Sequence, residues 1–253
     1  MPKVIGIIPA RYASTRLPGK MLRDLYGKPL IQRVYENATQ ASALSEVIVA
    51  TDHQAIKDVI QAAGGRAVMT SENLASGTDR IATVAQTIDA DVVVNIQGDE
   101  PFLHPEDINT VANLILDHKE AVAGTLIKKI SKTEELRDPN IVKVTVRQNH
   151  QALYFSRHPI PYARDAKNDA EWMSCATYFK HIGIYSYRKS FLLEYASWPP
   201  SSLELAEKLE QLRILEHGYS IHVAETEHEP MGIDTEADLQ MAIQRIQNQL
   251  MKG

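Results

Sequence analysis

The sequence VIGIIPARYASTRLPGK, residues 4–20, gives the clearest indication of how this chain folds. The apolar run Val4–Ile8 predicts a buried strand that ends at Pro9. The loop that follows carries polar and cationic side chains, Arg11, Ser14, Arg16 and Lys20. Backbone N–H groups and fixed cations in such a loop bind phosphate oxygens, and in α/β sheets ligands bind at the carboxyl ends of strands. We therefore expect a triphosphate here, although a solvated basic loop would have the same composition.

Composition places the chain among ordinary globular proteins. It has 253 residues, of which 44% are hydrophobic and 23% charged, enough for one large α/β domain or two small ones. The net charge of −5 provides no general attraction to nucleic acid or to an anionic membrane. Because the cations are clustered locally, a small anionic molecule is the better candidate for a partner.

The remaining bulk features predict a cytoplasmic protein. The N-terminus lacks the charged-then-apolar layout of a signal peptide, and no apolar run approaches the roughly 20 residues of a spanning helix. The single cysteine, Cys175, excludes an internal disulfide and is consistent with a reducing compartment. A role for it as a nucleophile is not indicated.

The first half of the chain alternates between strand and helix patterns. Strands are expected at Val4–Ile8, Glu46–Ala50, Arg66–Met69 and Val92–Ile96. Helices are expected between them, at about 29–41, 54–63 and 79–88. This alternation is typical of βαβ units and predicts a parallel sheet covered on both faces.

The pattern changes after about residue 120, where strands follow one another without a long helix between them. They are expected at 121–130, 141–146, 152–155 and 180–188, with an irregular segment at 157–178. Two helices, at about 203–217 and 236–250, flank a strand at 220–225. We therefore predict one α/β domain over residues 1–253, with an interleaved smaller lobe at roughly 125–190.

Three short motifs contain candidate ligand-binding residues, and each has a structural alternative. Asp99 follows the strand Val92–Ile96 and could bind Mg²⁺, which takes carboxylate oxygens, or could be a turn residue. Asp234 could do the same or could cap the final helix, as Thr235 could. The motif Ser76–Arg80 precedes a helix, so its hydroxyls could serve as caps. Asp52 is also expected to cap a helix.

The strand at 180–188 offers a wall for a second pocket. Alternate residues of a strand share a face, so His181, Gly183 and Tyr185 point to the same side. A histidine and a tyrosine in a strand are more often core or surface residues than ligands. The pattern alone leaves both readings open.

The whole loop resembles a known family. Residues 8–20 match the pattern I-P-A-R-x-x-S-x-R-L-P-x-K, and neither a Walker A motif nor the G-x-G-x-x-G of dinucleotide binders is present. The loop is similar to that of the CMP-Kdo synthetases, or 3-deoxy-manno-octulosonate cytidylyltransferases. Further motifs resemble the same family in the same order, namely S-G-T-D-R at 76–80, Q-G-D-E-P at 97–101, L-E-Q-L-R at 209–213 and G-I-D-T at 232–235. Two departures are Tyr162, where a Trp is expected, and the segment 167–177.

The resemblance implies a Rossmann-like nucleotide-diphospho-sugar transferase fold, with a mostly parallel sheet and a smaller mixed α/β lobe. It implies the transfer of a cytidylyl group from CTP to 3-deoxy-D-manno-octulosonate (Kdo), giving CMP-Kdo and pyrophosphate for lipopolysaccharide biosynthesis. It further implies Mg²⁺, two ions with one carried by the nucleotide, and a homodimer. The alternatives are an 8-amino-Kdo or another 2-keto sugar acid as acceptor, and a non-catalytic CTP-binding protein. The sialic acid synthetases are disfavoured, because their loop resembles G-x-P-x-K-N.

The resemblance also assigns roles to individual residues. The catalytic set is Arg11, Arg16, Lys20, Asp99 and Asp234, with the two aspartates as metal ligands. The nucleotide-binding set is Ala10, Arg11, Ser14, Arg16, Lys20, Ser76, Gly77, Arg80 and Gln97. The sugar-binding set is Gln97, Arg157, His181, Tyr185, Glu210 and Gln211, in which the Arg157 fork is expected to bind the sugar carboxylate.

Overall fold

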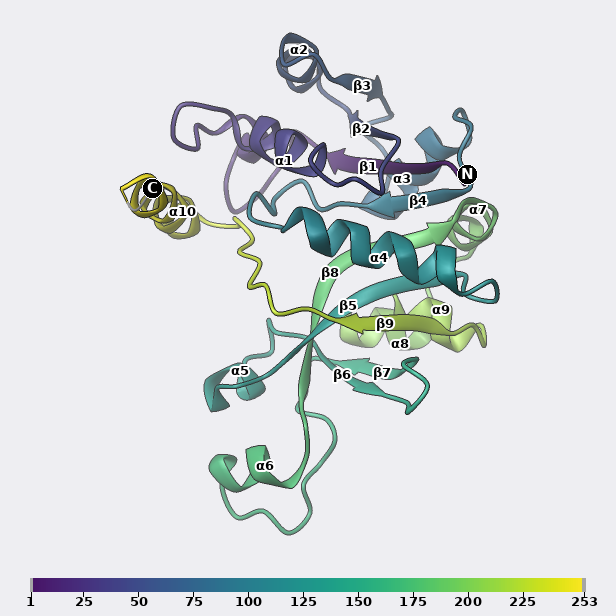
Figure 1. The fold of residues 1–253 in the computed structure, drawn as a ribbon, viewed down its shortest axis with the longest axis vertical. Coiled ribbons are helices and arrows are strands. Elements are labelled where there is room, and N and C mark those ends of the chain that lie inside the picture. Colours follow the sequence, from purple (N-terminus) through teal and green to yellow (C-terminus); the bar gives the residue numbers. More distant parts are fainter. Residues whose placement is uncertain (1, 252–253) are drawn as a thin grey trace.

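A computed structural model describes residues 2–251 as one nine-stranded sheet with helices on both faces (Figure 1). The strands are β1 (Val4–Ala10), β2 (Glu46–Thr51), β3 (Arg66–Met69), β4 (Val92–Asn95), β5 (Ala123–Lys129), β6 (Lys143–Val146), β7 (Ala152–Ser156), β8 (Phe179–Arg188) and β9 (Ile221–Glu225). The helices are α1 (Leu30–Ala38), α2 (Gln54–Ala62), α3 (Gly77–Ala85), α4 (Pro105–Asp117), α5 (Thr133–Arg137), α6 (Asp169–Cys175), α7 (Lys189–Ser197), α8 (Ser202–Glu207), α9 (Leu212–Glu216) and α10 (Glu236–Leu250), with a short 3₁₀ turn η1 (Lys20–Leu22).

The strand order is β3-β2-β1-β4-β8-β5-β9, and β6 joins β8 with β7 beside it. The strands β1 to β4 pair in parallel, as the βαβ pattern predicts. Strand β8 runs antiparallel to both β4 and β5, so the sheet becomes mixed after residue 120, as expected. The predicted Rossmann-like α/β fold is confirmed.

Each face of the sheet has its own hydrophobic core. In β1, Val4 and Ile8 pack into one core while Ile5 and Ile7 pack into the other, because alternate side chains point to opposite faces. The first core is covered by α1, α2, α4 and α10, and the second by α3, α7 and α9. A strand buried on both faces is a near-continuous apolar run, which is why the sequence revealed β1 and β4 clearly.

The prediction that β1 ends before Pro9 is wrong, because the strand continues to Ala10. The carbonyl of Ile7 accepts from the N–H of Ile96. The backbone N–H and C=O groups of the odd-numbered residues in β1 therefore point towards β4. Strand β4 ends at Asn95, opposite Ile7, and the position of Pro9 therefore requires no donor on that side. A proline is tolerated in a central strand at this point because its neighbour has already ended.

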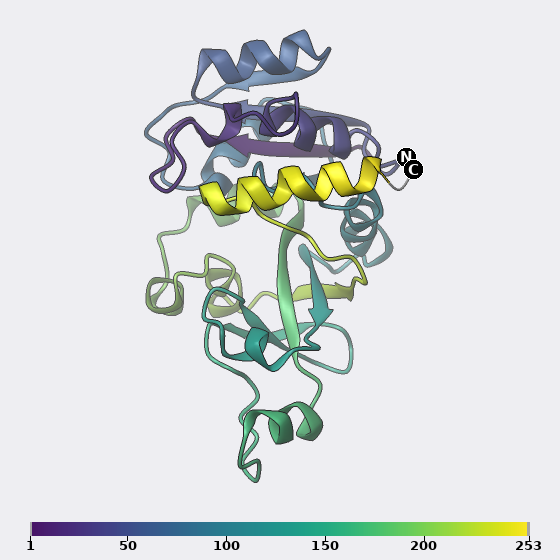
Figure 2. The same ribbon diagram turned by 90° about the vertical axis from the view of Figure 1, so that its left-hand side faces the viewer.

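A smaller lobe projects from the sheet and contains α5, α6, β6 and β7 (Figures 1 and 2). It has its own hydrophobic cluster, which includes Leu136, Trp172 and Tyr178. The prediction of an irregular segment at 157–178 missed α6, whose first turn is capped by the side chain of Asn168. The exact limits of the lobe and the single-domain assignment stay predictions.

In the second half, one helix prediction is wrong in detail and one helix was missed. The helix expected at 203–217 is broken into α8 and α9 at Lys208, which adopts a left-handed conformation with φ 55°. Helix α7, directly after β8, was not predicted. Nothing in the apolar pattern marks the break at Lys208, whereas α7 carries the buried residues Phe191, Leu192 and Tyr195 at helical spacing.

Within residues 2–251, no helix combines the length and apolarity needed to traverse a membrane. Cys175 is exposed at the end of α6.

Gly98 is expected to be essential for the contact between the β4 loop and β1. A Cβ at this position would lie 2.8 Å from the carbonyl oxygen of Pro9, so a side chain forces the backbone apart. Gly98→Ala should lower the free energy of unfolding by about 1–3 kcal/mol, the usual cost of overpacking. Urea denaturation measures this cost. The matched control is Gly77→Ala, whose Cβ meets Pro9 at an ordinary 3.5 Å; an equal loss in both variants would contradict the argument.

Candidate active site

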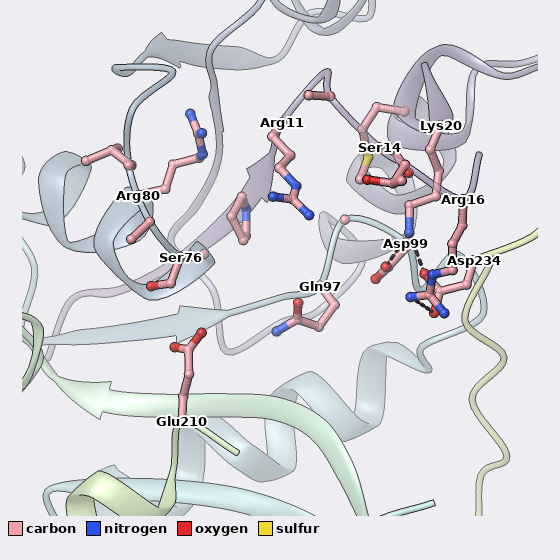
Figure 3. Close-up of a pocket in the computed structure, with 18 residues that line it drawn as sticks. Arg11, Ser14, Arg16, Lys20, Ser76, Arg80, Gln97, Asp99, Glu210 and Asp234 are labelled. Atoms are coloured by element: carbon pink, nitrogen blue, oxygen red, sulfur yellow. Dashed lines mark hydrogen bonds and ion pairs between the residues drawn. The ribbon is translucent and has the colours of Figure 1, made fainter. Parts of the chain in front are cut away.

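The carboxyl ends of β1 and β4 open into a pocket with a volume of about 400 Å³ (Figure 3). Parallel strands place their carboxyl ends at one edge of the sheet, and the loops after them supply the side chains. Predicted residues that line this pocket are Arg11, Ser14, Arg16, Lys20, Ser76, Gly77, Arg80, Gln97, Asp99, Glu210 and Asp234. Ala10 does not line it; this residue is buried in the sheet, and Pro9 takes its place in the wall.

Lys20 joins the two predicted metal ligands. Its ammonium group donates to Asp99 Oδ2 at 2.7 Å and to Asp234 Oδ1 at 2.9 Å, although these residues are far apart in sequence. Lys20 is 7% exposed. Burial alone would lower the pKa of Lys20, but the two carboxylates raise it above its ordinary value. Lys20 is therefore a permanent cation in the pocket floor.

The other two cations of the loop lie nearer the solvent. Arg16 contacts Asp234 Oδ2 at 2.9 Å and keeps 67% of its side chain exposed. Figure 3 shows the guanidinium group of Arg11 pointing into the pocket. These two side chains can rearrange around an anion at little cost, whereas Lys20 is held in place by two ion pairs.

The far wall of the pocket begins helix α3. Ser76 caps this helix in a reciprocal pair with Asp79, so the structural alternative for the motif is correct. Arg80 is buried and donates to Asp52 Oδ2 at 3.0 Å and to the Thr70 hydroxyl. Capping and pocket lining are compatible here, because the first turn of α3 leaves Ser76, Gly77 and Arg80 along the wall.

The prediction that Asp52 caps α2 is wrong. The cap is the imidazole of His53, which accepts from the N–H of Ala55. Asp52 instead binds Arg80 and accepts from the N–H of Tyr12 at 2.9 Å. It follows a strand in the same way as Asp99 does, and that placement was the available signal for a role at this edge.

The carboxylates of the pocket fit a hard divalent cation. Glu100, which was not predicted, lies beside Asp99 and Asp234 and has a buried Oε2 without a hydrogen-bond partner among residues 2–251. Burial, followed by repulsion from Asp99 and Asp234, raises the pKa of Glu100 to about 8. Converging carboxylate oxygens are the ligands that Mg²⁺ takes in proteins. Asp99 and Asp234 could thus hold such an ion.

A second pocket of about 260 Å³ adjoins the first. The two share Gly77, Gln97 and Glu210 in their walls. His181, Gly183 and Tyr185 all line the second pocket, as the strand periodicity predicts, and Gln211 lines it too. Asn95 and Tyr187 also line it and were not predicted. Asn95, a polar residue within an apolar strand, was the signal that could have indicated this.

Several polar side chains of the second pocket have hydrogen-bonding capacity that the described residues leave unused or only partly used. The Tyr185 hydroxyl and Asn95 Oδ1 are buried without hydrogen-bond partners among the described residues. Burial lowers the pKa of His181 to about 3, so its ring is neutral, and its Nε2 lies 3.0 Å from the Thr125 hydroxyl. Burial also raises the pKa of Glu210, although the Thr78 hydroxyl donates to it. Such groups suit the hydroxyls of a polar ligand.

Arg157 lines neither of these two pockets, and its expected place in the sugar site stays a prediction. Its guanidinium group donates to three backbone carbonyls, those of Glu207 at 2.8 Å, Pro139 at 2.9 Å and Lys208 at 3.4 Å. The Arg157 N–H also donates to the Glu207 carboxylate at 2.9 Å. The Arg157 guanidinium group therefore stabilises the break between α8 and α9, which lies directly before Glu210 and Gln211.

Comparison with known proteins identifies the family. The sequence matches the cytidylyltransferase family over residues 5–223. A 3-deoxy-manno-octulosonate cytidylyltransferase of Trichlorobacter lovleyi is 49% identical over 96% of this chain and 98% of that relative. The chain belongs to the 3-deoxy-manno-octulosonate cytidylyltransferase family. Another member, from Parabacteroides distasonis, is 50% identical over 98% of this chain and 100% of that relative.

Solved structures agree with this family assignment. One of CMP:2-keto-3-deoxy-manno-octonic acid synthetase complexed with CTP is 42% identical, with a TM-score of 0.91 over 98% of this chain and 99% of that chain. A 4-diphosphocytidyl-2C-methyl-D-erythritol synthase from Anaerococcus prevotii matches with a TM-score of 0.63 over 97% of this chain and 99% of that chain. At 12% identity it shows a shared fold alone. The resemblance inferred from the loop motif is confirmed, and the family consists of nucleotidyltransferases.

His181 should make the folded protein sensitive to acid. The unfolded chain takes up a proton at the ordinary histidine pKa of 6.5, whereas the folded chain does so only near 3. The contribution of His181 to the free energy of unfolding is therefore fully present above pH 6.5. It is lost as the pH falls from 6.5 towards 3. Between pH 7.5 and 5, wild type should therefore lose about 1–2 kcal/mol more stability than His181→Gln. Urea titrations at both pH values measure this difference.

The exposed His217 is the control for this measurement. His217→Gln should follow wild type at both pH values. If His181→Gln and His217→Gln lost stability equally on acidification, His181 would not be the responsible group.

Proposed function

We propose that this protein transfers a cytidylyl group from CTP to the anomeric hydroxyl of Kdo, giving CMP-Kdo and pyrophosphate. The observation that carries the proposal is the pair of adjoining pockets, one lined by cations and carboxylates and the other mainly by uncharged polar and aromatic side chains. The relatives named for this reaction span nearly the whole chain, and a structural neighbour was solved with CTP. CMP-Kdo would then serve lipopolysaccharide biosynthesis.

The triphosphate would lie against the loop after β1. Arg11, Arg16 and Lys20 all line that pocket and are suited to the charge that gathers on the departing pyrophosphate. Attack of the sugar hydroxyl on the α-phosphorus forms the new P–O bond and breaks the bond to pyrophosphate. No protein nucleophile is needed, so we expect no covalent intermediate.

The base would lie against the start of α3. The Arg80 guanidinium is fixed by Asp52 and Thr70, so it presents a rigid set of donors beside Ser76 and Gly77. Gly77 has no side chain, which leaves the backbone of the first turn open to a flat ring. These features support the assignment of cytosine recognition to Ser76, Gly77 and Arg80, while Ser14 lies in the loop proposed for the triphosphate.

Asp99 and Asp234 would hold Mg²⁺, as their convergence on Lys20 and the buried Glu100 carboxyl support. When bound, Mg²⁺ supplies charge neutralisation at the α-phosphate and lowers the pKa of the sugar hydroxyl. The protein's own part is to keep the two carboxylates at the edge shared by β1 and β4. A second ion carried by the nucleotide is part of the same proposal.

The acceptor would occupy the second pocket. Gln97 and Glu210 lie between the two pockets, and His181, Tyr185 and Gln211 line the inner walls. The neutral His181 ring and the unpartnered Tyr185 hydroxyl suit sugar hydroxyls. A non-catalytic CTP-binding protein would need neither this pocket nor the paired carboxylates, so the enzyme is the better proposal. A homodimer and a cytoplasmic location stay predictions.

The direct test is pyrophosphate release with Mg²⁺ from CTP, UTP, GTP or ATP, each with Kdo, its 8-amino analogue or N-acetylneuraminate. Release with CTP and Kdo supports the proposal. Release with the 8-amino analogue in preference to Kdo would change the acceptor but keep the reaction. Tight CTP binding without release from any pair would instead indicate a nucleotide-binding protein.

Arg16 should be needed for the reaction and dispensable for the fold. Arg16→Ala is expected to lower kcat/KM for CTP by about 10²–10³, by analogy with the loss of one preorganised charge-stabilising donor. Steady-state rates at saturating acceptor measure this. Arg23→Ala is the matched control, because Arg23 pairs with Glu236 at 2.7 Å and does not line the pocket. Near-native activity of Arg16→Ala would refute the assignment of Arg16 to the triphosphate.

Arg157 should act on the acceptor through the backbone at Lys208. A left-handed lysine costs about 1–2 kcal/mol, and the Arg157 hydrogen bonds offset this cost. Arg157→Ala should therefore raise the KM for Kdo about tenfold and leave the KM for CTP unchanged. Glycine adopts this conformation freely, so in a Lys208→Gly background the same Arg157→Ala change should cost little. An equal loss in both backgrounds would mean that Arg157 contacts the substrate directly.

A further inference from the structure

Three side chains bring two imidazoles and a carboxylate together far from the nucleotide pocket. His118 ends helix α4, Glu120 lies in the turn before β5, and His222 lies in β9. His118 Nδ1 and His222 Nε2 each lie 3.7 Å from the same oxygen, Glu120 Oε1. One ligand atom from each residue lies within 4.8 Å of the other two. The two rings stack with centroids 5.2 Å apart.

The cluster lies at the opposite end of the strands from the active site. Strands β4 and β5 both run antiparallel to β8, so they point the same way. Strand β9 is parallel to β5, with His222 opposite Gly124 near the start of both strands. The nucleotide pocket lies at the carboxyl ends of β1 and β4. The cluster is therefore separate from the cytidylyl-transfer site.

One ligand of the cluster is fixed and two can move. His222 is 5% exposed, and its backbone is held by pairing with β5 and by a bridge to Gln151. His118 and Glu120 keep 50% and 69% of their side chains exposed. A buried anchor with two adjustable partners can close around an ion without a change in the backbone.

The protonation state of His222 also suits metal binding. Its Nδ1 is buried and has no hydrogen-bond partner among the residues that the structure describes. Burial, followed by repulsion from His118, lowers the pKa of His222, so the ring is neutral near pH 7. A neutral imidazole is the form that binds a metal, and the ligand atom of His222 would be Nε2, the nitrogen that faces Glu120. The neighbouring Gln151 amide, 3.4 Å from His222 Nε2, contacts the side of the ring that faces Glu120.

We propose that His118, Glu120 and His222 form a binding site for a divalent transition-metal ion of the zinc class. Tetrahedral zinc with bonds of about 2.0 Å separates its ligand atoms by about 3.3 Å, so the two 3.7 Å pairs need only small side-chain movements. Imidazole ligands favour zinc over magnesium, which prefers oxygen. Three protein ligands leave a fourth position for water. The ion ties the end of α4 to the start of β9.

The test is isothermal titration of the untagged, chelator-treated full chain with ZnCl₂. Cys175→Ser is the background, because an exposed thiol such as that of Cys175 competes for zinc. Excess MgCl₂ is present to occupy the carboxylates of the active site, so that zinc binding there does not contribute to the measured heat. No nucleotide or sugar is added, so the result is independent of the proposed reaction. One zinc ion per chain is expected, with a rise of about 5 °C in Tm at saturating zinc.

His118→Ala and Glu120→Gln test the site itself. Both residues are exposed, so the fold should tolerate their loss, and each change should weaken zinc binding at least about tenfold. Lys119→Ala, in the same exposed turn, is the matched control and should bind as the background does. The proposal is overturned if the background shows no saturable binding, or if His118→Ala binds zinc with unchanged affinity.

Discussion

The ion pairs of one buried lysine hold the active site together. Lys20 lies between Asp99 and Asp234, which follow strand β4 and precede helix α10. Without the Lys20 ammonium group the two carboxylates would repel each other. Removing either aspartate would leave the buried Lys20 ammonium with one counter-charge instead of two, which would destabilise the folded protein. The loop after β1 thus both lines the pocket and determines where the two aspartates lie.

The segment that delivers Asp234 is held by the same edge of the sheet. The N–H of Ile233 donates to the carbonyl of Asp99 at 2.9 Å, and the Ile233 side chain is fully buried. Thr235 and Asp238 bond to each other and cap α10, so the cap does not require Asp234. The cap predicted for this motif is therefore formed at Thr235, which leaves the Asp234 carboxylate available for the proposed metal.

Sequence reasoning succeeded where a strand buried on both faces ends in a polar loop. The apolar runs of β1 and β4 predict neighbouring parallel strands, and this alone brings Lys20 and Asp99 to one edge. It failed where tertiary contacts override local preference. The left-handed Lys208 is stabilised by a hydrogen bond from Arg157, which directly follows β7. No local sequence pattern predicts this contact.

The hydrogen bonds of Arg157 were missed for the same reason. An arginine near a presumed sugar site suggests a carboxylate fork, but backbone carbonyls at a broken helix also accept from a guanidinium group. The carbonyls of Glu207 and Lys208 at the break, and that of Pro139, occupy three of its five N–H donors. The break could not be predicted from residues 203–217, because helix formers run through it without interruption. The metal-class cluster of His118, Glu120 and His222 was missed for a related reason, since its members meet only through the pairing of β5 with β9.

Charge balance explains why the cationic loop alone would not suffice for the proposed reaction. The nucleotide pocket is lined by the cations Arg11, Arg16, Lys20 and Arg80 and by the carboxylates Asp99, Glu210 and Asp234. Arg80 is already paired with Asp52 outside this set. A triphosphate adds further negative charge to a pocket that is close to neutral, so a divalent cation is needed to complete the balance. Lys20 can then exchange one carboxylate for a phosphate oxygen and never be left unpaired, which keeps the cost of binding low in a buried position.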